Sequence, residues 1–408
     1  MNCARQMVSL ASGLILIALS PRATAQDWPQ WRGPNRDDKV SGFTPPKTWP
    51  QEFHQKWKVT VGQAAATPAL VGGKLYVFAR LGENEVIQCL DAATGKEIWS
   101  NKYEVMAADG PASKHPGPRS SPAVAEGKVV TFGVRGTLSC LDAADGKLVW
   151  RKDDIRGWPM FYTSMSPLII DGLCVAQVGS KTNGALIAYD LSTGAEKWRW
   201  SGDGTAYASP VAMSIGGAKL IVAETDKRIV AVNLADGKLA WEAPFLASGM
   251  GGYNAATPLV DGQTIIYTGS GRGTLAVELQ KAGDTFTAKQ LWANPGLAAR
   301  FCTPVMKDGL IFGLSDKAGF YCLDAKTGQT AWSDPTQRGG FGSILDAGTA
   351  LVALTPKSHL IVFQPSDKAY TEVASIKVAD TATYSQPVLA GDRLFIEDQD
   401  SVTLWTLD

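Results

Sequence analysis

Residues Cys89 to Trp99 read CLDAATGKEIW, and this stretch decides the fold because it recurs along the chain. Four further copies end at a tryptophan in the same place: CLDAADGKLVW to Trp150, AYDLSTGAEKW to Trp198, AVNLADGKLAW to Trp241 and CLDAKTGQTAW to Trp332. A longer, altered copy ends at Trp292. Self-similarity with a period of about 40–50 residues is typical of propellers and solenoids. The spacing therefore predicts a repeat architecture.

Each repeat carries the turn signals of a small antiparallel sheet. A Ser-Pro or Thr-Pro pair opens the first strand in six copies, and Gln386-Pro387 replaces it in the last; proline at the first residue of a strand loses no ladder hydrogen bond. An Asp/Asn-x-x-x-Gly turn, such as Asp142 to Gly146, precedes the strand that carries the tryptophan. A glycine hairpin follows the first strand eight times, at Gly73, Gly127, Gly172, Gly217, Gly262, Gly309, Gly348 and Gly391.

The two ends of the chain complement each other. The eighth copy stops at Asp408, before its fourth strand, whereas residues 54–62 (HQKWKVTVG) place Trp57 like Trp99 with no repeat before it. The N-terminal strand should therefore pair with the last three strands and close a ring, which leaves only short sheet edges. We predict an all-β fold over residues 53–408: an eight-bladed β-propeller of four-stranded antiparallel blades, closed by the N-terminal strand.

The first 25 residues have the pattern of a secretory signal peptide, with Arg5 before an apolar run and Ala23-Thr24-Ala25 as a cleavage site. The apolar run is too short to span a membrane comfortably, and no other run could. We therefore expect a periplasmic or secreted protein without a transmembrane segment. No cysteine directly follows the apolar run, so a lipid anchor is not indicated. Residues 26–52, rich in Pro, Gly and Trp, are expected to form an ordered arm across the body.

Charge and cysteine content narrow the function classes. The formal net charge is zero, whereas nucleic-acid binding favours a basic face, so we expect no nucleic-acid partner. Cys89, Cys140 and Cys322 occupy one position of the repeat where other copies carry alanine. Equivalent positions in different repeats lie far apart, so these cysteines should be small core residues rather than a disulfide framework. The cysteine spacings match no zinc pattern, and no metal site is expected.

The pattern Leu90-Asp91-Ala92-Ala93-Thr94-Gly95-Lys96-Glu97-Ile98-Trp99 resembles the PQQ-like (pyrroloquinoline quinone) propeller repeat. The opening DWPQWRGPNRD of residues 27–37 is similar to that of exported bacterial proteins of this superfamily. The resemblance implies that each tryptophan docks on the turn of an adjacent blade. It leaves function open, because the repeat serves both quinoprotein dehydrogenases and non-catalytic BamB-type scaffolds.

The quinoprotein class implies specific residues. Its members hold the quinone over two adjacent cysteines and bind calcium through Glu, Asn and Asp, with a further Asp as base. This chain has no Cys-Cys pair and no extended acidic insertion, so we expect no cofactor and assign no catalytic residue. Of the three histidines, His54, His115 and His359, only His115 is a candidate for chemistry. The glycine run Gly269 to Gly273 is expected to be a turn rather than a phosphate cradle, because no helix follows it.

The remaining candidates lie in the loops that lead into each first strand. Large residues stand a few positions before the prolines, and the two longest loops, residues 101–119 and 151–162, are neighbours. Exposed Trp, Tyr and Arg suit a protein hot spot or a stacked sugar; the alternative is that they plug the channel and pack adjacent blades. The predicted binding residues are Lys114, His115, Arg119, Arg156, Trp158, Phe161, Tyr162, Tyr207, Tyr253, Arg300 and Tyr384, with Phe301 and Phe341 beside them.

Three functions are compatible with these observations. The favoured hypothesis is an exported, monomeric, non-catalytic propeller that binds a protein or another extended ligand through one face of the ring. The first alternative is a quinone (PQQ)-dependent oxidoreductase with an atypical site. The second is a carbohydrate-binding module.

Overall fold

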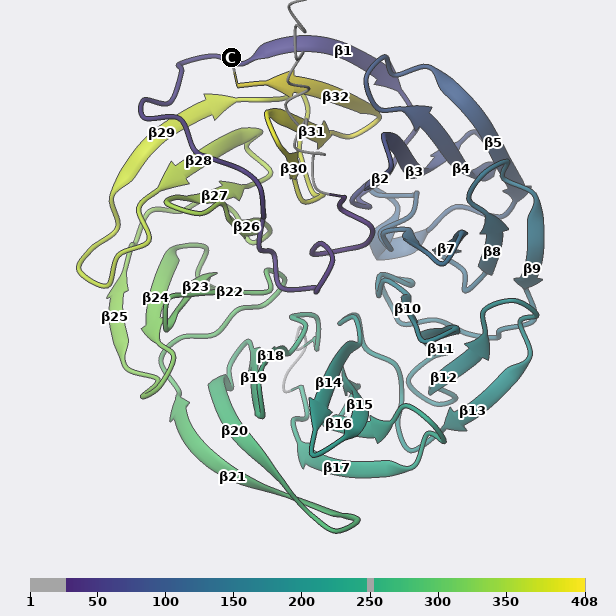
Figure 1. Ribbon diagram of the computed structural model, residues 1–408, viewed down its shortest axis with the longest axis vertical. Helices are drawn as coiled ribbons and strands as arrows, with labels where there is room; N and C mark the ends of the chain where they lie inside the picture. Colours follow the sequence, from purple (N-terminus) through teal and green to yellow (C-terminus); the bar gives the residue numbers. More distant parts are fainter. Residues whose placement is uncertain (1–26, 248–252, 408) are drawn as a thin grey trace, which may run out of the picture.

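The structure, a computed structural model, describes residues 27–247 and 253–407. Apart from one short 3-10 helix, η1 (Gly110–Ala112), the regular structure of the described residues consists of strands. The strands form eight four-stranded sheets arranged as a ring around a central channel (Figure 1). Each sheet is antiparallel throughout, as in the first blade, where β2 pairs with β3, β3 with β4 and β4 with β5. The predicted eight-bladed propeller is therefore confirmed.

The strands follow the repeats in chain order. The closing strand is β1 (His54–Thr60), and the first three blades are β2 (Ala69–Val71), β3 (Lys74–Leu81), β4 (Asn84–Asp91), β5 (Glu97–Glu104); β6 (Ala123–Ala125), β7 (Lys128–Phe132), β8 (Leu138–Asp142), β9 (Leu148–Lys152); and β10 (Leu168–Ile170), β11 (Leu173–Val178), β12 (Ala185–Asp190), β13 (Glu196–Trp200). The next two are β14 (Val211–Ile215), β15 (Ala218–Glu224), β16 (Arg228–Asn233), β17 (Leu239–Pro244); and β18 (Leu259–Asp261), β19 (Thr264–Gly269), β20 (Gly273–Ala282), β21 (Thr285–Asn294). The last three are β22 (Val305–Lys307), β23 (Leu310–Leu314), β24 (Phe320–Asp324), β25 (Thr330–Ser333); β26 (Ser343–Asp346), β27 (Leu351–Leu354), β28 (His359–Phe363), β29 (Glu372–Lys377); and β30 (Val388–Ala390), β31 (Arg393–Glu397), β32 (Ser401–Thr406).

The ring is closed by strands from both ends of the chain. In the eighth blade the strand order is β1-β32-β31-β30, so the N-terminal strand supplies the outer strand. Trp57 pairs with Leu404 across the β1–β32 ladder. Closure by the N-terminal strand is thus as predicted, and it leaves the ring without a free seam.

Tryptophans on the outer strands seal blades against their neighbours, except in the seventh blade, whose outer strand β29 carries none. Trp99 Nε1 donates to the carbonyl oxygen of Ala143 in the following blade at 3.3 Å, and Trp198 Nε1 donates to the carbonyl oxygen of Leu234 at 2.7 Å. The indole lies on the glycine of the neighbouring turn: Gly146 has φ +73°, and a Cβ there would lie 2.7 Å from Trp99 Cδ2. A glycine is therefore required for its positive φ and for the close approach of the ring.

The fifth blade departs from the repeat. Strands β20 and β21 each run for ten residues and form a long hairpin where five of the other blades carry the short Asp/Asn-x-x-x-Gly turn. The hairpin overhangs the previous blade (Figure 1), where Phe286 packs against that blade's apolar cluster and Lys281 Nζ donates to the Gly216 carbonyl oxygen at 3.3 Å. This replacement explains why the copy of the repeat that ends at Trp292 is stretched.

A ring of hydroxyl groups surrounds the channel at the start of the first strands. In six blades the Ser or Thr before the proline accepts, through its side-chain oxygen, a hydrogen bond from the backbone N–H of its counterpart in the preceding blade. Ser209 N, for example, donates to Thr257 Oγ1 at 2.9 Å. The other such bonds are Thr67 N to Ser121 Oγ, Ser121 N to Ser166 Oγ, Ser166 N to Ser209 Oγ, Thr257 N to Thr303 Oγ1 and Gln386 N to Thr67 Oγ1. The sequence pattern accounts for the proline at the start of each of these strands, whereas the hydroxyl before it joins neighbouring blades.

The N-terminal arm enters the channel. Its backbone bonds to the first blade between Trp28 and Leu70, at 2.7 and 2.9 Å, and to the seventh blade between Val40 N and Asp346 O, at 2.9 Å. Between these points the chain passes into the centre of the ring (Figure 1). The predicted signal peptide lies outside the described residues. Within the described ranges, no helix is long and apolar enough to cross a membrane.

Buried charges fix the arm. Arg32 and Asp38 are fully buried, and Arg32 Nε lies 2.8 Å from Asp38 Oδ2. Gln386 joins both residues, accepting from Arg32 N at 3.1 Å and donating to Asp38 Oδ1 at 2.9 Å. Arg36 donates to the carbonyl oxygens of Ser166 at 3.2 Å and Pro210 at 2.8 Å. The arm thus satisfies inward-facing carbonyl groups that the ring alone would leave unpaired.

Candidate functional site

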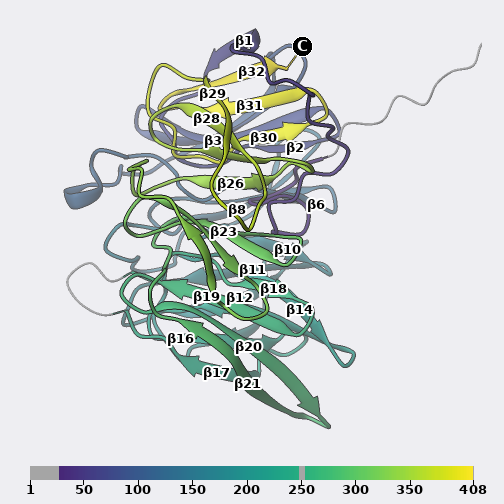
Figure 2. The same ribbon diagram turned by 90° about the vertical axis from the view of Figure 1, so that its left-hand side faces the viewer.

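A cavity of about 480 Å³ opens on the face that bears the loops leading into the first strands. We call this face the loop face, and the cavity the funnel. Figure 2 shows the ring from its side, with the segment between β5 and β6 protruding from the loop face and the arm toward the opposite one. The funnel is lined by Trp31, Ala65, Pro111, Ala112, His115, Arg119, Phe161, Ser164, Tyr207, Ser209, Tyr253, Ala255, Thr257, Arg300, Phe301, Phe341 and Tyr384.

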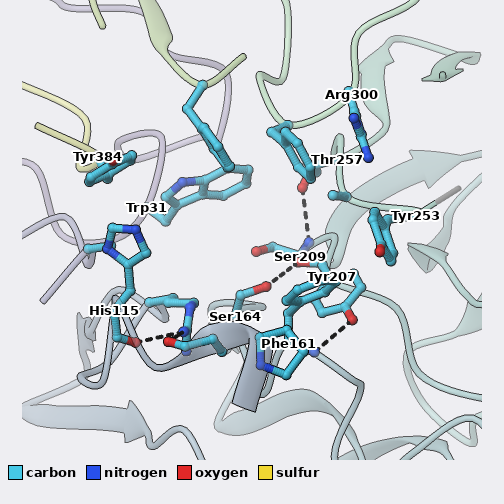
Figure 3. A pocket seen from close by; sticks show the side chains of 17 residues that line it. Trp31, His115, Phe161, Ser164, Tyr207, Ser209, Tyr253, Thr257, Arg300 and Tyr384 are labelled. Atoms are coloured by element: carbon cyan, nitrogen blue, oxygen red, sulfur yellow. Dashed lines mark hydrogen bonds between the residues drawn. The ribbon is translucent and has the colours of Figure 1, made fainter. Parts of the chain in front are cut away.

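Seven of the eleven predicted binding residues line this cavity. They come from loops that lead into the first strands of several blades, and Figure 3 shows most of them pointing toward a common space. The seven are His115, Arg119, Phe161, Tyr207, Tyr253, Arg300 and Tyr384. The repeat brings them together because they stand at similar offsets from their first strands.

Aromatic rings form the wall of the funnel by packing on one another. Phe161 and Tyr207 both meet Tyr253, edge to face, with ring centroids 5.1 and 5.8 Å apart. Phe301 stacks on Phe341 with centroids 4.5 Å apart and planes 9° apart. Edge-to-face and offset packing of this kind holds rings in place. The aromatics therefore pack between blades, in agreement with the structural alternative, and still leave an open cavity.

The floor of the funnel is built by the arm. Trp31 lines the funnel, while its neighbours Arg32, Asn35 and Arg36 line a second cavity of about 700 Å³ on the opposite side. The arm therefore lies between the two cavities, and Trp31 forms part of the inner end of the funnel. Trp31 is not among the predicted site residues. The sequence predicts an ordered, tryptophan-rich arm, but no local pattern indicates that the arm enters the channel.

The funnel is basic. His115, Arg119 and Arg300 line it, and none of its lining residues is Asp or Glu. Arg119 Nη2 donates to the carbonyl oxygen of His115 at 2.7 Å, whereas its Nη1 is covered by protein and has no hydrogen-bond partner among the described residues. Arg300 lies over the rings of Tyr253 and Phe301, at 5.6 and 4.8 Å from their centroids. Burial, together with the charges of Arg119 and Lys114, lowers the pKa of His115.

Four predicted residues lie outside the funnel. Tyr162 is buried, and its hydroxyl donates to Asp109. Trp158 stacks on Tyr162 with centroids 5.7 Å apart, and the guanidinium of Arg135 lies over both rings, at 5.0 and 5.2 Å. This cluster joins the two long loops to each other. The other two, Lys114 and Arg156, are exposed outside the funnel.

The residues needed to hold a quinone in the known manner are not found here. The chain has no adjacent cysteines, and the five cysteines that the structure describes are free and buried, as expected for core residues. Across residues 27–247 and 253–407, no three His, Cys, Asp or Glu side chains gather in a way that could hold a metal ion. The quinoprotein constellation therefore does not fit the described residues.

The closed eight-bladed ring and its tryptophan-on-glycine docking define the class of PQQ-like β-propellers. The family model described as outer membrane protein assembly factor BamB matches residues 82–334, more than half of the chain. The chain belongs to this family. BamB of Burkholderia pseudomallei is 25% identical over 361 residues, which cover 86% of this chain and 86% of that protein.

Solved structures show the same fold at lower identity. BamB from Moraxella catarrhalis superposes with a TM-score of 0.64 and 14% identity, covering 87% of this chain and 97% of that chain. The quinohemoprotein alcohol dehydrogenase of Comamonas testosteroni superposes with a TM-score of 0.69 and 15% identity, covering 93% of this chain and 80% of that chain. In sequence, a quinohemoprotein alcohol dehydrogenase of the same organism is 32% identical over 139 residues, only 33% of this chain and 19% of the enzyme.

Proposed function

We propose that this protein is an exported scaffold of outer-membrane protein assembly that binds a polypeptide segment in the funnel on its loop face. The observation that carries the proposal is the funnel itself: an open cavity walled by packed aromatic rings and arginines, on the face with the longest loops. Tyr, Trp and Arg are the residues that dominate the energetics of protein interfaces. Residues 1–25 would direct export to the periplasm, and the propeller would act as a monomer.

The side chains around the funnel favour a protein as its ligand. Phe341 is 44% exposed at the mouth, and Met106 and Met160, at 70% and 64%, stand on the two long loops. Flexible, exposed methionines adapt to apolar partners of varied shape. Similarity to BamB proteins over most of both chains points in the same direction.

Selection from a peptide library tests the proposal while the partner is still unidentified. A library of random peptides displayed on phage is panned against the purified protein and against a Phe341→Ser, Tyr253→Ala variant. We expect the wild-type protein to enrich a common motif that the variant loses. The matched control is Leu148→Ser, because Leu148 is 47% exposed on the outer strand β9, away from the loop face. Loss of the motif in this control, or no enrichment by the wild type, would refute the funnel as a protein site.

The two alternatives are tested on the same preparation. Tight binding of pyrroloquinoline quinone with calcium and substrate-dependent dye reduction would support an oxidoreductase. Retention on immobilised oligosaccharides, lost in the Phe341→Ser, Tyr253→Ala variant, would support a carbohydrate-binding module. We expect neither result.

A further inference from the structure

We infer that the second cavity, on the other side of the arm from the funnel, binds an extended segment of another polypeptide in which a large apolar residue precedes a proline. We call it the arm-side cavity; its volume is about 700 Å³, and most of its lining belongs to the fifth and sixth blades. The inference goes beyond the proposed function, because it concerns the opposite face of the ring. It is carried by the way in which the arm itself docks on the first and second blades.

The arm docks by adding its backbone to the inner edges of two neighbouring blades. Trp28 N donates to the carbonyl oxygen of Leu70 at 2.7 Å, and Leu70 N donates to the carbonyl oxygen of Trp28 at 2.9 Å. The next residue, Pro29, accepts at its carbonyl oxygen from Val124 N at 2.8 Å. Proline suits this second position, because no N–H is used there and because proline holds the residue before it in an extended conformation. One apolar–proline pair thus occupies two blade edges.

Val260 and Met306 hold the same places in the fifth and sixth blades. Each is the middle residue of a three-residue first strand, as Leu70 and Val124 are. The registers agree as well, because in all four blades this middle residue lies opposite the second residue of the second strand. The backbone N–H and carbonyl groups of Val260 and Met306 therefore face the channel, as those of Leu70 and Val124 do.

The arm covers the first two of these residues and leaves the other two open. Leu70 is 1% and Val124 5% exposed, whereas Val260 and Met306 are half-buried and line the arm-side cavity. Beyond the ladders of their own blades, no backbone hydrogen bond within the described ranges reaches Val260 or Met306. Unpaired groups on a strand edge are a template for another chain, and main-chain hydrogen bonds to such an edge are a common mode of peptide recognition.

The walls of the arm-side cavity suit a large apolar side chain. Leu259 and Ile266 line it, and Leu291 of the outer strand β21 is 40% exposed in the same lining. Between the arm and the first blade, Trp28 is 1% exposed and belongs to the apolar core. A partner's apolar side chain would gain affinity in the same way, by leaving water. Side chains of both charges also line the cavity, so the partner need carry no net charge.

Paired synthetic peptides test the inference on the whole protein. A fluorescently labelled Gly/Ser peptide with Trp-Pro at its centre is compared, by fluorescence anisotropy, with the same peptide carrying Pro-Trp. We expect the reversed peptide to bind about tenfold more weakly, because a proline in the first position has no N–H to donate and the indole is displaced from its wall.

Substitution of Met306 tests the edge itself. Met306→Pro removes the N–H that would donate to the peptide, at a strand edge where proline is tolerated. Met306→Ala is the matched control, because it shortens the side chain and keeps that N–H. We expect Met306→Pro to bind the Trp-Pro peptide about threefold to tenfold more weakly than Met306→Ala does, which corresponds to one hydrogen bond. Equal binding by the two variants would overturn the inference.

The outcomes separate this inference from the proposed function. The Phe341→Ser, Tyr253→Ala variant, changed only in the funnel, should bind the Trp-Pro peptide as the wild-type protein does. Loss of binding in that variant would overturn the inference, because the peptide would then lie in the funnel. Equal binding of the two peptides by the wild-type protein, or no binding of Trp-Pro, would also overturn it and would leave the phage selection to decide the proposed function. If Met306→Pro does not fold, the two peptides on the wild-type protein still decide.

A second copy of this chain is the other occupant that the test must exclude, because each copy carries its own Trp28-Pro29 pair. Sedimentation velocity over a range of concentrations distinguishes the two occupants. We expect a monomer throughout. A dimer that forms at high concentration and that the Trp-Pro peptide dissociates would overturn the inference, since the arm-side cavity would then hold another copy rather than a partner.

Discussion

Replacing Gly146 with alanine should destabilise the ring far more than replacing Gly127, although both glycines adopt φ +73° in the same blade. Gly127 lies in the hairpin between β6 and β7, and a Cβ there would meet nothing within 4 Å. A Cβ on Gly146 would lie 2.7 Å from Trp99 Cδ2, well inside contact distance. The pair therefore separates backbone strain from the docking of the tryptophan.

The expected magnitudes follow from these two environments. An alanine in the left-handed region costs about 1–2 kcal/mol, and Gly127→Ala should cost only this. Gly146→Ala should cost a further ~1–3 kcal/mol, because overpacking a close contact forces its neighbours to move. Trp99 is 9% exposed, and Trp99→Ala alone should cost about 3–5 kcal/mol.

Urea unfolding of the single and double variants measures these terms. In a Trp99→Ala background, Gly146→Ala should lower the free energy of unfolding no more than Gly127→Ala does, because the indole that the new Cβ would displace is absent. The resulting coupling between positions 99 and 146 should be about 1–3 kcal/mol. Equal effects of the two glycine substitutions in the wild-type background would show that the tryptophan does not seal the blades as described.

Three further predictions concern the channel and the funnel. Burial raises the pKa of Asp38 to about 7, although Arg32 and Gln386 oppose the shift. The folded protein therefore holds this proton up to a higher pH than the unfolded chain does, so stability against urea should decrease as the pH rises from about 4 to about 7, and Asp38→Asn should remove this slope. Thr257→Val removes the acceptor for Ser209 N and should lower the free energy of unfolding by about 1–3 kcal/mol. Thr257→Ser keeps a hydroxyl and should retain most of the stability of the wild-type protein. Thermal unfolding of both variants checks this, and equal losses of stability in the two variants would contradict it. In Arg119→Gln, NMR titration should find a higher pKa for His115, because one of the causes of its lowered pKa is the Arg119 charge; an unchanged pKa would place the two side chains too far apart to interact.

The number of blades and the closure of the ring could be predicted because both depend on short local sequence patterns. Positive-φ glycines mark every first hairpin, and the tryptophan and the Asp-x-x-x-Gly turn mark the outer strand. An unmatched strand at one end and a missing strand at the other define the pairing of Trp57 with Leu404. Repetition also placed Tyr207, Tyr253 and Arg300 at one end of the channel, because equal offsets in each repeat become equal positions in space.

The position of the arm could not be predicted, because it depends on contacts between distant parts of the chain. Arg32, Arg36 and Asp38 resemble ordinary surface charges in sequence, yet they are buried, and the two arginines donate to carbonyl groups of several blades. Their burial is possible only because a closed ring presents those unpaired carbonyls. The contact of Trp31 with the funnel could not be predicted either, because it also depends on where the arm lies in the closed ring.

Sequence patterns could also not predict which side chains of the two long loops are exposed and which are buried. Trp158 and Tyr162 are predicted at the binding surface because they stand in a long loop a few positions before the proline of a first strand. In the structure, Tyr162 is buried and bound to Asp109, and Trp158 covers it. An irregular loop has no period to reveal which side chains turn inward, so only its packing partners decide.

Site-specific photo-crosslinking tests the central claim, that the funnel is where this protein holds another polypeptide. A photoreactive amino acid replaces Phe341 at the mouth of the funnel or, as a control, Leu148 on the outer strand β9; these side chains are 44% and 47% exposed. The account predicts that illumination of the producing bacterium links position 341 to another protein and leaves position 148 unlinked. Crosslinks from position 148 alone, or from neither position, would contradict it.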